Sequence, residues 1–134
     1  LNASGRYIDN KYAQYASIEF IGGIYDINIL NMLRHYAIIY FHGHSVGGTN
    51  PSLLEAMSSN ALIIANDNIF NKSILNDNAF YFNSSIEISK YVDKIIKKEH
   101  ISLLENNQRS IENHFNWNLI NKEYLDLMNK IKNS

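Results

Sequence analysis

A buried strand, a glycine-rich turn and a helix start follow one another in the middle of this sequence. The run Tyr36-Ala-Ile-Ile-Tyr-Phe-His42 is continuously apolar and β-branched, which is typical of a parallel strand covered on both faces. The turn Gly43-His-Ser-Val-Gly-Gly-Thr-Asn50 then leads into Pro51, a residue suited to the first position of a helix. This order predicts a strand, loop and helix of a parallel α/β sheet.

The rest of the chain repeats the alternation of short apolar runs and helical spacing. The expected further strands are Ser17–Gly22, Ala61–Ala65 and Ala79–Phe82. The expected helices are Ile8–Ala16, Ile27–His35, a helix from Pro51, Ile86–Lys98, Ile101–His114 and Trp117–Ile131, and Asp26 is the expected cap of the second. The predicted fold class is α/β, a Rossmann-like parallel sheet flanked by helices, with a helical C-terminus. Only about four strands are visible, fewer than a doubly wound sheet usually has. We therefore expect residues 1–134 to be one domain, truncated at its N-terminus.

Composition excludes several classes of function. Twelve basic residues against thirteen acidic residues leave a net charge of −1, so no overall field would attract nucleic acid. The chain has no cysteine, and its histidines show neither a metal-binding spacing nor a thiol partner, so no metal site is expected. No apolar run is long enough to span a bilayer and no signal peptide opens the chain, which favours a cytoplasmic location.

The glycine-rich turn is the first candidate for chemistry. Gly47 and Gly48 let the backbone approach a ligand closely, and the amides of Thr49, Ser52 and Leu53, with the two hydroxyls, suit a diphosphate. The turn has neither the lysine of a P-loop nor the spacing of a dinucleotide fingerprint. On spacing alone, a plain crossover turn with a capped helix fits equally well.

Glu55 places a carboxylate one turn into the following helix, among apolar neighbours. Such a carboxylate either binds a ligand or occupies a solvated helix face where it favours the helix dipole. Farther along, Lys94, Lys97 and Lys98 form a small basic edge. This edge is typical of a solvated surface, and its alternative use is contact with lipid headgroups in a membrane-associated protein.

One stretch resembles a known enzyme family. The run Phe41-His-Gly-His-Ser-Val-Gly-Gly-Thr-Asn-Pro-Ser-Leu-Leu-Glu-Ala-Met57, followed by Ala61-Leu-Ile-Ile-Ala-Asn-Asp67, resembles the donor-binding half of family-4 retaining GT-B glycosyltransferases. Ile18-Glu-Phe-Ile-Gly22 looks like the family's V-x-F-x-G strand, residues 28–37 look like its L-x-x-x-Y-x-x-A helix, and Phe115-Asn-Trp117 matches its F-x-W. The resemblance covers about Ile18–Met128, and its form is similar to a branch of rhamnosyl and related transferases of bacterial surface polysaccharides, such as capsule and lipopolysaccharide.

The resemblance implies roles for residues at the matching positions. Glu55 matches the glutamate that hydrogen-bonds the ribose hydroxyls of the nucleotide. The donor-binding turn is matched by Gly48, Thr49, Asn50 and Ser52, which would contact the diphosphate and the donor sugar. Ile24 and Tyr25 match positions near the base, where an aromatic face would stack, although packing at a strand end is an equal alternative for Tyr25.

The sequence departs from the family at one catalytic position. Gly47 replaces the first glutamate of the E-x7-E motif, which in the family contacts the transferred sugar, so this position supplies no carboxylate. His44 or Ser45 would then contact the sugar, and His44 and Gly47 are the candidate catalytic positions. The cationic residue that the family uses to neutralise the diphosphate is not found, because neither Arg6 nor Lys11 lies in the family's context.

The implied function is transfer of a hexosyl or rhamnosyl group from a nucleoside-diphosphate sugar to a polysaccharide or lipid-linked acceptor. No cofactor or metal is expected, since the family is metal-independent, and the acceptor would bind an N-terminal domain that is missing here. This part alone would be inactive and would bind the donor weakly. The full protein would be cytoplasmic, with peripheral association at the inner face of the plasma membrane as the alternative. The rival interpretation is a non-enzymatic α/β module for regulation or protein contact.

Overall fold

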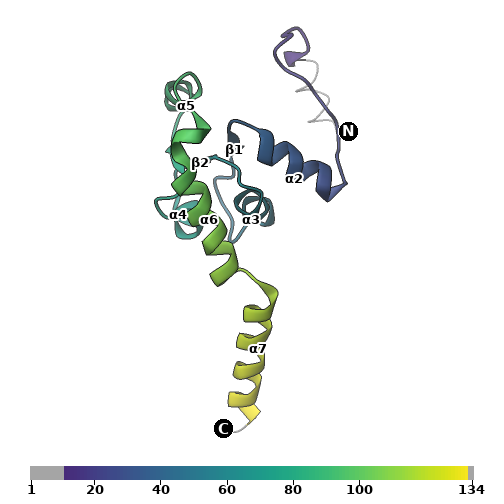
Figure 1. The fold of residues 1–134 in the computed structure, drawn as a ribbon, viewed down its shortest axis with the longest axis vertical. Coiled ribbons are helices and arrows are strands. Elements are labelled where there is room, and N and C mark those ends of the chain that lie inside the picture. The colour runs from purple at the N-terminus through teal and green to yellow at the C-terminus, as the bar shows by residue number, and fades with distance from the viewer. Residues whose placement is uncertain (1–10, 133–134) are drawn as a thin grey trace. The chain divides into compact units, whose positions relative to one another are not determined.

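The computed structural model describes residues 11–132 and shows an α/β fold (Figure 1). The chain separates into two compact units, residues 1–30 and 31–134. The second unit holds a three-stranded parallel sheet in the order β1-β2-β3, which alternates with helices. The predicted α/β class, with parallel strands and a helical C-terminus, is confirmed.

Helices and strands alternate from α2 to α5, and helices alone follow. Their bounds are α2 Ile27–Tyr36, β1 Tyr40–His42, α3 Pro51–Ser58, β2 Ile63–Asn66, α4 Ile69–Leu75, β3 Phe80–Phe82, α5 Ser85–Val92, the 3₁₀ turn η1 Lys97–His100, α6 Ile101–His114 and α7 Trp117–Lys132. The predicted helix starts are confirmed at two caps: Asp26 accepts the Asn28 amide at 2.8 Å, and Asn116 accepts the Leu119 amide at 2.9 Å.

The first unit differs from the sequence prediction. Of the helix expected at Ile8–Ala16, residues 8–10 lie outside the described part, residues 11–12 are helical and turns follow. The strand expected at Ser17–Gly22 is wrong, because residues 18–26 form no regular structure. A strand needs a neighbour to complete its hydrogen bonds, and the ladders of the described sheet join only β1, β2 and β3.

Two further element boundaries differ from the prediction, and one helix was not predicted. Tyr36 ends α2 instead of opening a strand, because the Ala37 amide still donates to the Leu33 carbonyl at 3.0 Å. The helix expected to reach Lys98 ends at Val92, after which the chain turns toward η1. The short helix α4 was not predicted at all, although Asn68 caps it by accepting the Asn71 amide at 2.9 Å.

One face of the sheet forms the main core. Tyr40, Ile63, Ala65 and Tyr81 share this face through the registers of the two ladders, and they pack with Leu53, Ala56 and Met57 of α3, Leu75 of α4 and Ile111 of α6. On the opposite face, Phe80 contacts the rings of Tyr91 in α5 and His100 in η1. Helices therefore cover both faces, as in doubly wound proteins.

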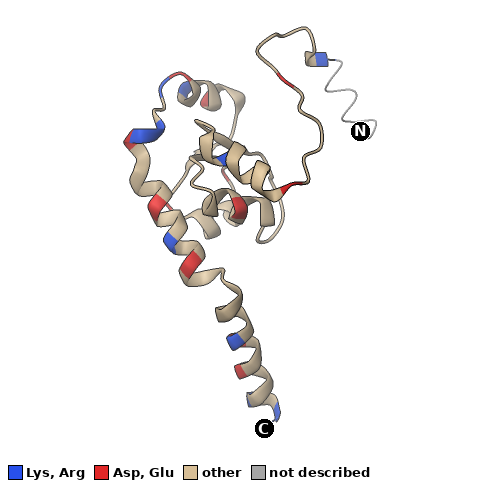
Figure 2. Ribbon diagram, turned by 45° about the vertical axis from the view of Figure 1, so that its right-hand side comes forward, with Lys and Arg blue, Asp and Glu red and all other residues tan. Residues whose placement is uncertain are grey.

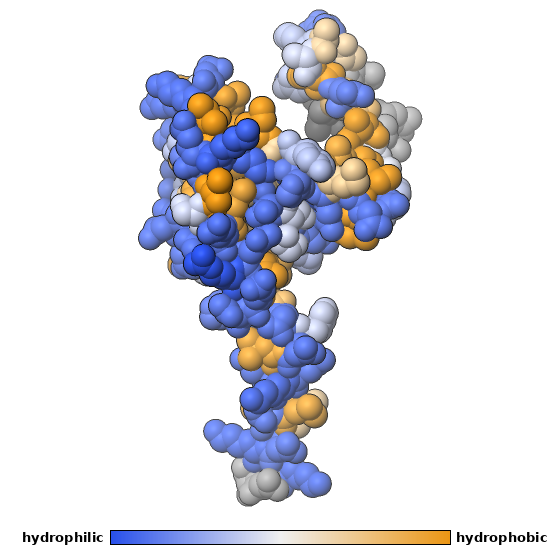
Figure 3. Space-filling view, in the orientation of Figure 1, coloured by the Kyte–Doolittle hydropathy of each residue, from blue (hydrophilic) through white to orange (hydrophobic). Residues whose placement is uncertain are grey.

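The last helix, α7, buries none of its residues. Apolar side chains lie exposed along it, among them Trp117, Tyr124, Leu127 and Ile131. Figure 3 shows orange, hydrophobic patches among the hydrophilic side chains of α7. An amphipathic helix of this kind gains little stability from packing within the described chain.

Candidate functional site

The glycine-rich loop lies at the carboxyl end of the sheet, as predicted. It leaves β1 after His42 and enters α3 at Pro51, and residues 43–49 are exposed. Gly47 has φ +131°, and a Cβ atom there would meet no atom within 4 Å. The backbone, and not a lack of space, therefore favours glycine at this position.

Asn50 caps the helix that follows the loop. Its Oδ1 accepts the Ser52 amide at 3.0 Å and the Ser52 hydroxyl at 2.8 Å, and its carbonyl accepts the Leu53 amide at 3.0 Å. The Ser52 amide and hydroxyl and the Leu53 amide, which the sequence offered to a diphosphate, are thus engaged with Asn50. An anion at the N-terminus of α3 would replace the Asn50 side-chain oxygen. Gly48 and Thr49, which come just before Asn50, are exposed.

Glu55 forms an ion pair that the sequence analysis did not predict. Arg34, on α2, donates from Nη2 to Glu55 Oε2 at 2.7 Å. The Arg34 side chain is 11% exposed and the Glu55 side chain 42% exposed. Arg34 also donates to Asn31 Oδ1 at 3.2 Å, so the guanidinium is held from two sides and fixes the carboxylate.

A second polar contact joins α2 to the end of α3. The Ser59 hydroxyl donates to Asn31 Oδ1 at 3.1 Å and to the Glu55 carbonyl at 2.6 Å, and His35 Nδ1 lies 3.2 Å from the Ser59 carbonyl. Glu55 therefore lies where α2 and α3 contact each other. A helix position with no structural role would not show these contacts.

His42, the last residue of β1, is buried beneath the loop. Its ring is 1% exposed, and neither Nδ1 nor Nε2 has a hydrogen-bond partner among the described residues. The ring stacks on that of His44, with centroids 4.7 Å apart and planes at 25°. Burial, and then the nearby charge of His44, lower the pKa of His42.

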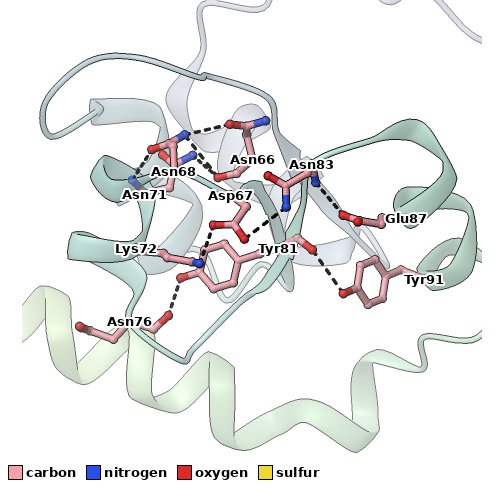
Figure 4. Close-up of polar contacts among 10 residues, drawn as sticks. All are labelled: Asn66, Asp67, Asn68, Asn71, Lys72, Asn76, Tyr81, Asn83, Glu87 and Tyr91. Carbon is pink, nitrogen blue, oxygen red and sulfur yellow. Dashed lines mark hydrogen bonds and ion pairs between the residues drawn. The ribbon is translucent and has the colours of Figure 1, made fainter.

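Two asparagines anchor the backbone of the loop. The His44 carbonyl accepts Asn68 Nδ2 at 3.0 Å and Asn71 Nδ2 at 3.1 Å. The same two side chains also donate to the Asn66 carbonyl at the end of β2, at 3.3 and 2.9 Å. Figure 4 shows these three asparagines gathered at that edge of the sheet. The candidate catalytic residue His44 is thus fixed through its main chain, while its ring is exposed.

An ion pair between Asp67 and Lys72 follows the end of β2. Asp67 contacts Lys72 Nζ at 2.5 Å and accepts Asn83 Nδ2 at 3.4 Å, as Figure 4 shows. The bond from Lys72, with the weaker one from Asn83, holds the pKa of Asp67 below its ordinary value, against desolvation. Burial, with the charges of two aspartates, raises the pKa of Tyr81 to about 12. Asp67 is satisfied by Lys72 and Asn83, and the Tyr81 hydroxyl donates to the Asn76 carbonyl, so little is left for a ligand.

Two predicted site residues belong to the first unit. Ile24 and Tyr25 precede α2, whereas the loop and Glu55 lie in the second unit. Their placement near a nucleotide base stays a prediction.

Neither the charge distribution nor the metal-ligating side chains of residues 11–132 indicate a binding site. In that range no group of three or more His, Cys, Asp or Glu side chains is arranged to hold a metal ion. Figure 2 shows acidic and basic residues interspersed along α6 and α7. No helix in the same range has the length and apolar character needed to cross a membrane.

Comparisons with known proteins found no relative: no family model, curated protein or solved structure matches this chain. The functional argument therefore depends on the residues and their geometry. Sequence reasoning missed Arg34 and His42, because a pairing across two helices and the burial of one strand residue are tertiary facts. The only local signal for His42 was its place at the end of an apolar run.

Proposed function

We propose that this chain is the donor-nucleotide-binding part of a GT-B glycosyltransferase acting on bacterial surface polysaccharide. The observation that carries the proposal is the exposed glycine-rich loop, which runs from the carboxyl end of β1 into the N-terminus of α3. Ligands of open α/β sheets bind at this edge, and a helix N-terminus favours an anion. The motif from Gly43 to Met57 supplies the family resemblance.

Glu55 supports the proposal through its partner. Because Arg34 engages Oε2 at 2.7 Å, the carboxylate is oriented while half exposed, and its other lone pairs can accept hydroxyl donors. A ribose presents two adjacent hydroxyls, which one fixed carboxylate binds together.

The loop then holds the diphosphate and the sugar. Amides at Gly48 and Thr49 face the leaving diphosphate as preorganised dipoles, and the exposed ring of His44 contacts the sugar in place of the family's glutamate. Transfer with retention follows from the resemblance, and the acceptor glycan or lipid-linked glycan binds an N-terminal domain. No metal or cofactor is required. The full protein works in the cytoplasm or at the inner face of the plasma membrane.

A second candidate is a non-enzymatic α/β module for regulation or protein contact. It is favoured by the Asn50 cap, which already engages the Ser52 amide and hydroxyl, and by the Arg34 contact of Glu55. In this case the loop is a plain turn, and the ion pair only joins two helices.

Nucleotide binding tests the proposal. Calorimetric titration with UDP, GDP and dTDP, at protein concentrations that detect millimolar binding, should show selective binding of one of them. Glu55→Gln should weaken that binding about tenfold or more, because it removes a charged acceptor. No binding by the wild type, or equal binding by Glu55→Gln, favours the non-enzymatic module.

Two control variants separate the carboxylate from the ion pair. Arg34→Gln removes the same ion pair and keeps the Glu55 carboxylate, so it should weaken binding less than Glu55→Gln. Glu105→Gln removes an equal charge from a surface pair with Arg109, whose atoms lie 3.4 Å apart on α6, and should leave nucleotide binding unchanged. A loss shared equally by all three variants would contradict a role for the Glu55 carboxylate.

A further inference from the structure

His42 is a buried polar side chain whose polar atoms have no partner. It ends β1 opposite Ala65, it is 1% exposed, and neither ring nitrogen is hydrogen-bonded within the described residues. Buried polar groups are nearly always satisfied, and an unsatisfied one destabilises the folded state. A buried imidazole without a partner calls for an explanation, such as a catalytic role or a bound ion or water.

The ring of His42 faces the glycine-rich loop. Its stacking partner His44 is the second residue of that loop, with ring centroids 4.7 Å apart, and His44 is exposed whereas His42 is not. Asn68 and Asn71 hold the His44 carbonyl at 3.0 and 3.1 Å. The backbone over His42 is therefore anchored, and the exposed His44 ring is the part that can turn aside and uncover it.

The surroundings of His42 select the kind of ligand. Tyr40, on the same strand, stacks at 6.3 Å, and His44 is the charged group that acts on His42. Neither Tyr40 nor His44 is acidic, so neither of these two neighbours offers His42 a carboxylate. A metal ion would need further ligands, and residues 11–132 hold no group of three that could supply them. An imidazole N–H is instead suited to donate to a phosphoryl oxygen.

We propose that His42, uncovered when the His44 ring turns aside, donates a hydrogen bond to a phosphoryl oxygen of the diphosphate held by the loop Gly43–Asn50. This inference rests on the proposed function and names a diphosphate-binding residue that the sequence motif did not indicate. His42 supplies a donor from beneath the loop, whereas the amides of Gly48 and Thr49 approach from the loop itself.

Inorganic pyrophosphate is the probe, because it has the phosphoryl groups and lacks ribose and base. Calorimetry should show binding by the wild type, and His42→Phe, which keeps a buried ring of similar shape, should weaken it about tenfold. His100→Phe is the matched control, since His100 contacts Phe80 at 5.0 Å on the opposite face of the sheet, and it should bind as the wild type does. Circular dichroism verifies that each variant is folded.

A second measurement does not depend on any variant. In the wild type, the ring nitrogen resonances of His42 should shift on addition of pyrophosphate, as a new hydrogen bond forms, while those of His100 should not. Absent binding, or resonances of His42 that stay unchanged at saturation, overturn the inference.

The outcomes separate this inference from the proposed function. If a nucleoside diphosphate binds and depends on Glu55, while His42→Phe changes neither its affinity nor that of pyrophosphate, the role of His42 is overturned and the donor site stands. If pyrophosphate binds through His42 and no nucleoside diphosphate binds more tightly, the phosphate contact stands and the donor-nucleotide proposal is overturned.

Discussion

The ion pair between Arg34 and Glu55 should contribute measurably to folding. The two atoms lie 2.7 Å apart, with side-chain exposures of 11% and 42%. A charge-assisted hydrogen bond contributes about 1.5–3 kcal/mol when shielded, but the exposure of Glu55 screens this pair toward the values of surface pairs. We therefore expect a coupling free energy of about 1 kcal/mol between the two side chains.

The single substitutions should cost different amounts. Arg34→Ala removes the pair, the bond to Asn31 and the packing of a nearly buried stem, so it should lower the free energy of unfolding by about 2 kcal/mol. Glu55→Ala removes a half-exposed side chain and should cost about 1 kcal/mol. If the double variant costs less than the sum of both, the difference is the coupling energy.

Urea unfolding followed by far-ultraviolet circular dichroism provides the four free energies of the cycle. The matched control is the pair Arg109 and Glu105, which lies on one helix with atoms 3.4 Å apart and both side chains more than half exposed. Its coupling should be about 0.3–0.5 kcal/mol. A coupling of Arg34 and Glu55 no larger than this control would refute the reasoning, because the contact would then not hold α2 against α3.

Three further outcomes follow from other contacts. Gly47→Ala should lower the free energy of unfolding by about 1–2 kcal/mol in urea, because φ is +131°, whereas Gly48→Ala, at a position without a positive φ, should change it by less than about 0.5 kcal/mol. Lys97→Met should cost about 1 kcal/mol, because its ammonium donates to the main-chain carbonyls of His35 and Ala37 at the end of α2. An equal loss in Lys98→Met, an exposed neighbour, would contradict this. The pKa of Tyr81 is raised to about 12 in the folded protein, so the unfolded chain loses this proton at a lower pH. The free energy of unfolding should therefore fall between about pH 10 and 12, by about 2 kcal/mol more in the wild type than in Tyr81→Phe.

The elements that were predicted correctly share strong local signals. The start of α3 combines Asn50 as the cap with Pro51 in the first turn, and both features are local. Ser84 accepts the Glu87 amide at 3.3 Å and starts α5, close to the predicted start at Ile86. Where a side chain three residues away decides the boundary, a sequence is sufficient.

The misplaced elements depend on distant partners. Residues 17–22 have the apolar content of a strand, but a strand forms only beside a neighbour with matching hydrogen-bonding groups. Helix α4 is short, and Leu75 is its fully buried anchor in the main core. A helix of this length is too short to be stable without tertiary contacts, so its periodicity alone was not a sufficient signal.

The candidate site divides in the same way. The loop and its approach to α3 follow from neighbouring residues and were predicted from them. The pairing of Glu55 with Arg34 joins positions 21 residues apart, and the anchoring of His44 by Asn68 and Asn71 spans 24 and 27 residues. No local pattern specifies such contacts, since they depend on how helices pack on the sheet.

The sequence alone determined the α/β class, the parallel strands, the glycine-rich loop at the sheet's carboxyl edge and most helix starts, because hydrophobic period and capping chemistry act over a few residues. Only the tertiary structure decided that Glu55 is held by Arg34, that Gly47 has a positive φ in this loop, and that His42 is buried with unsatisfied nitrogens. The physical reason is that burial and ion pairing arise from side chains brought together by folding, so their energies depend on neighbours that are remote along the chain.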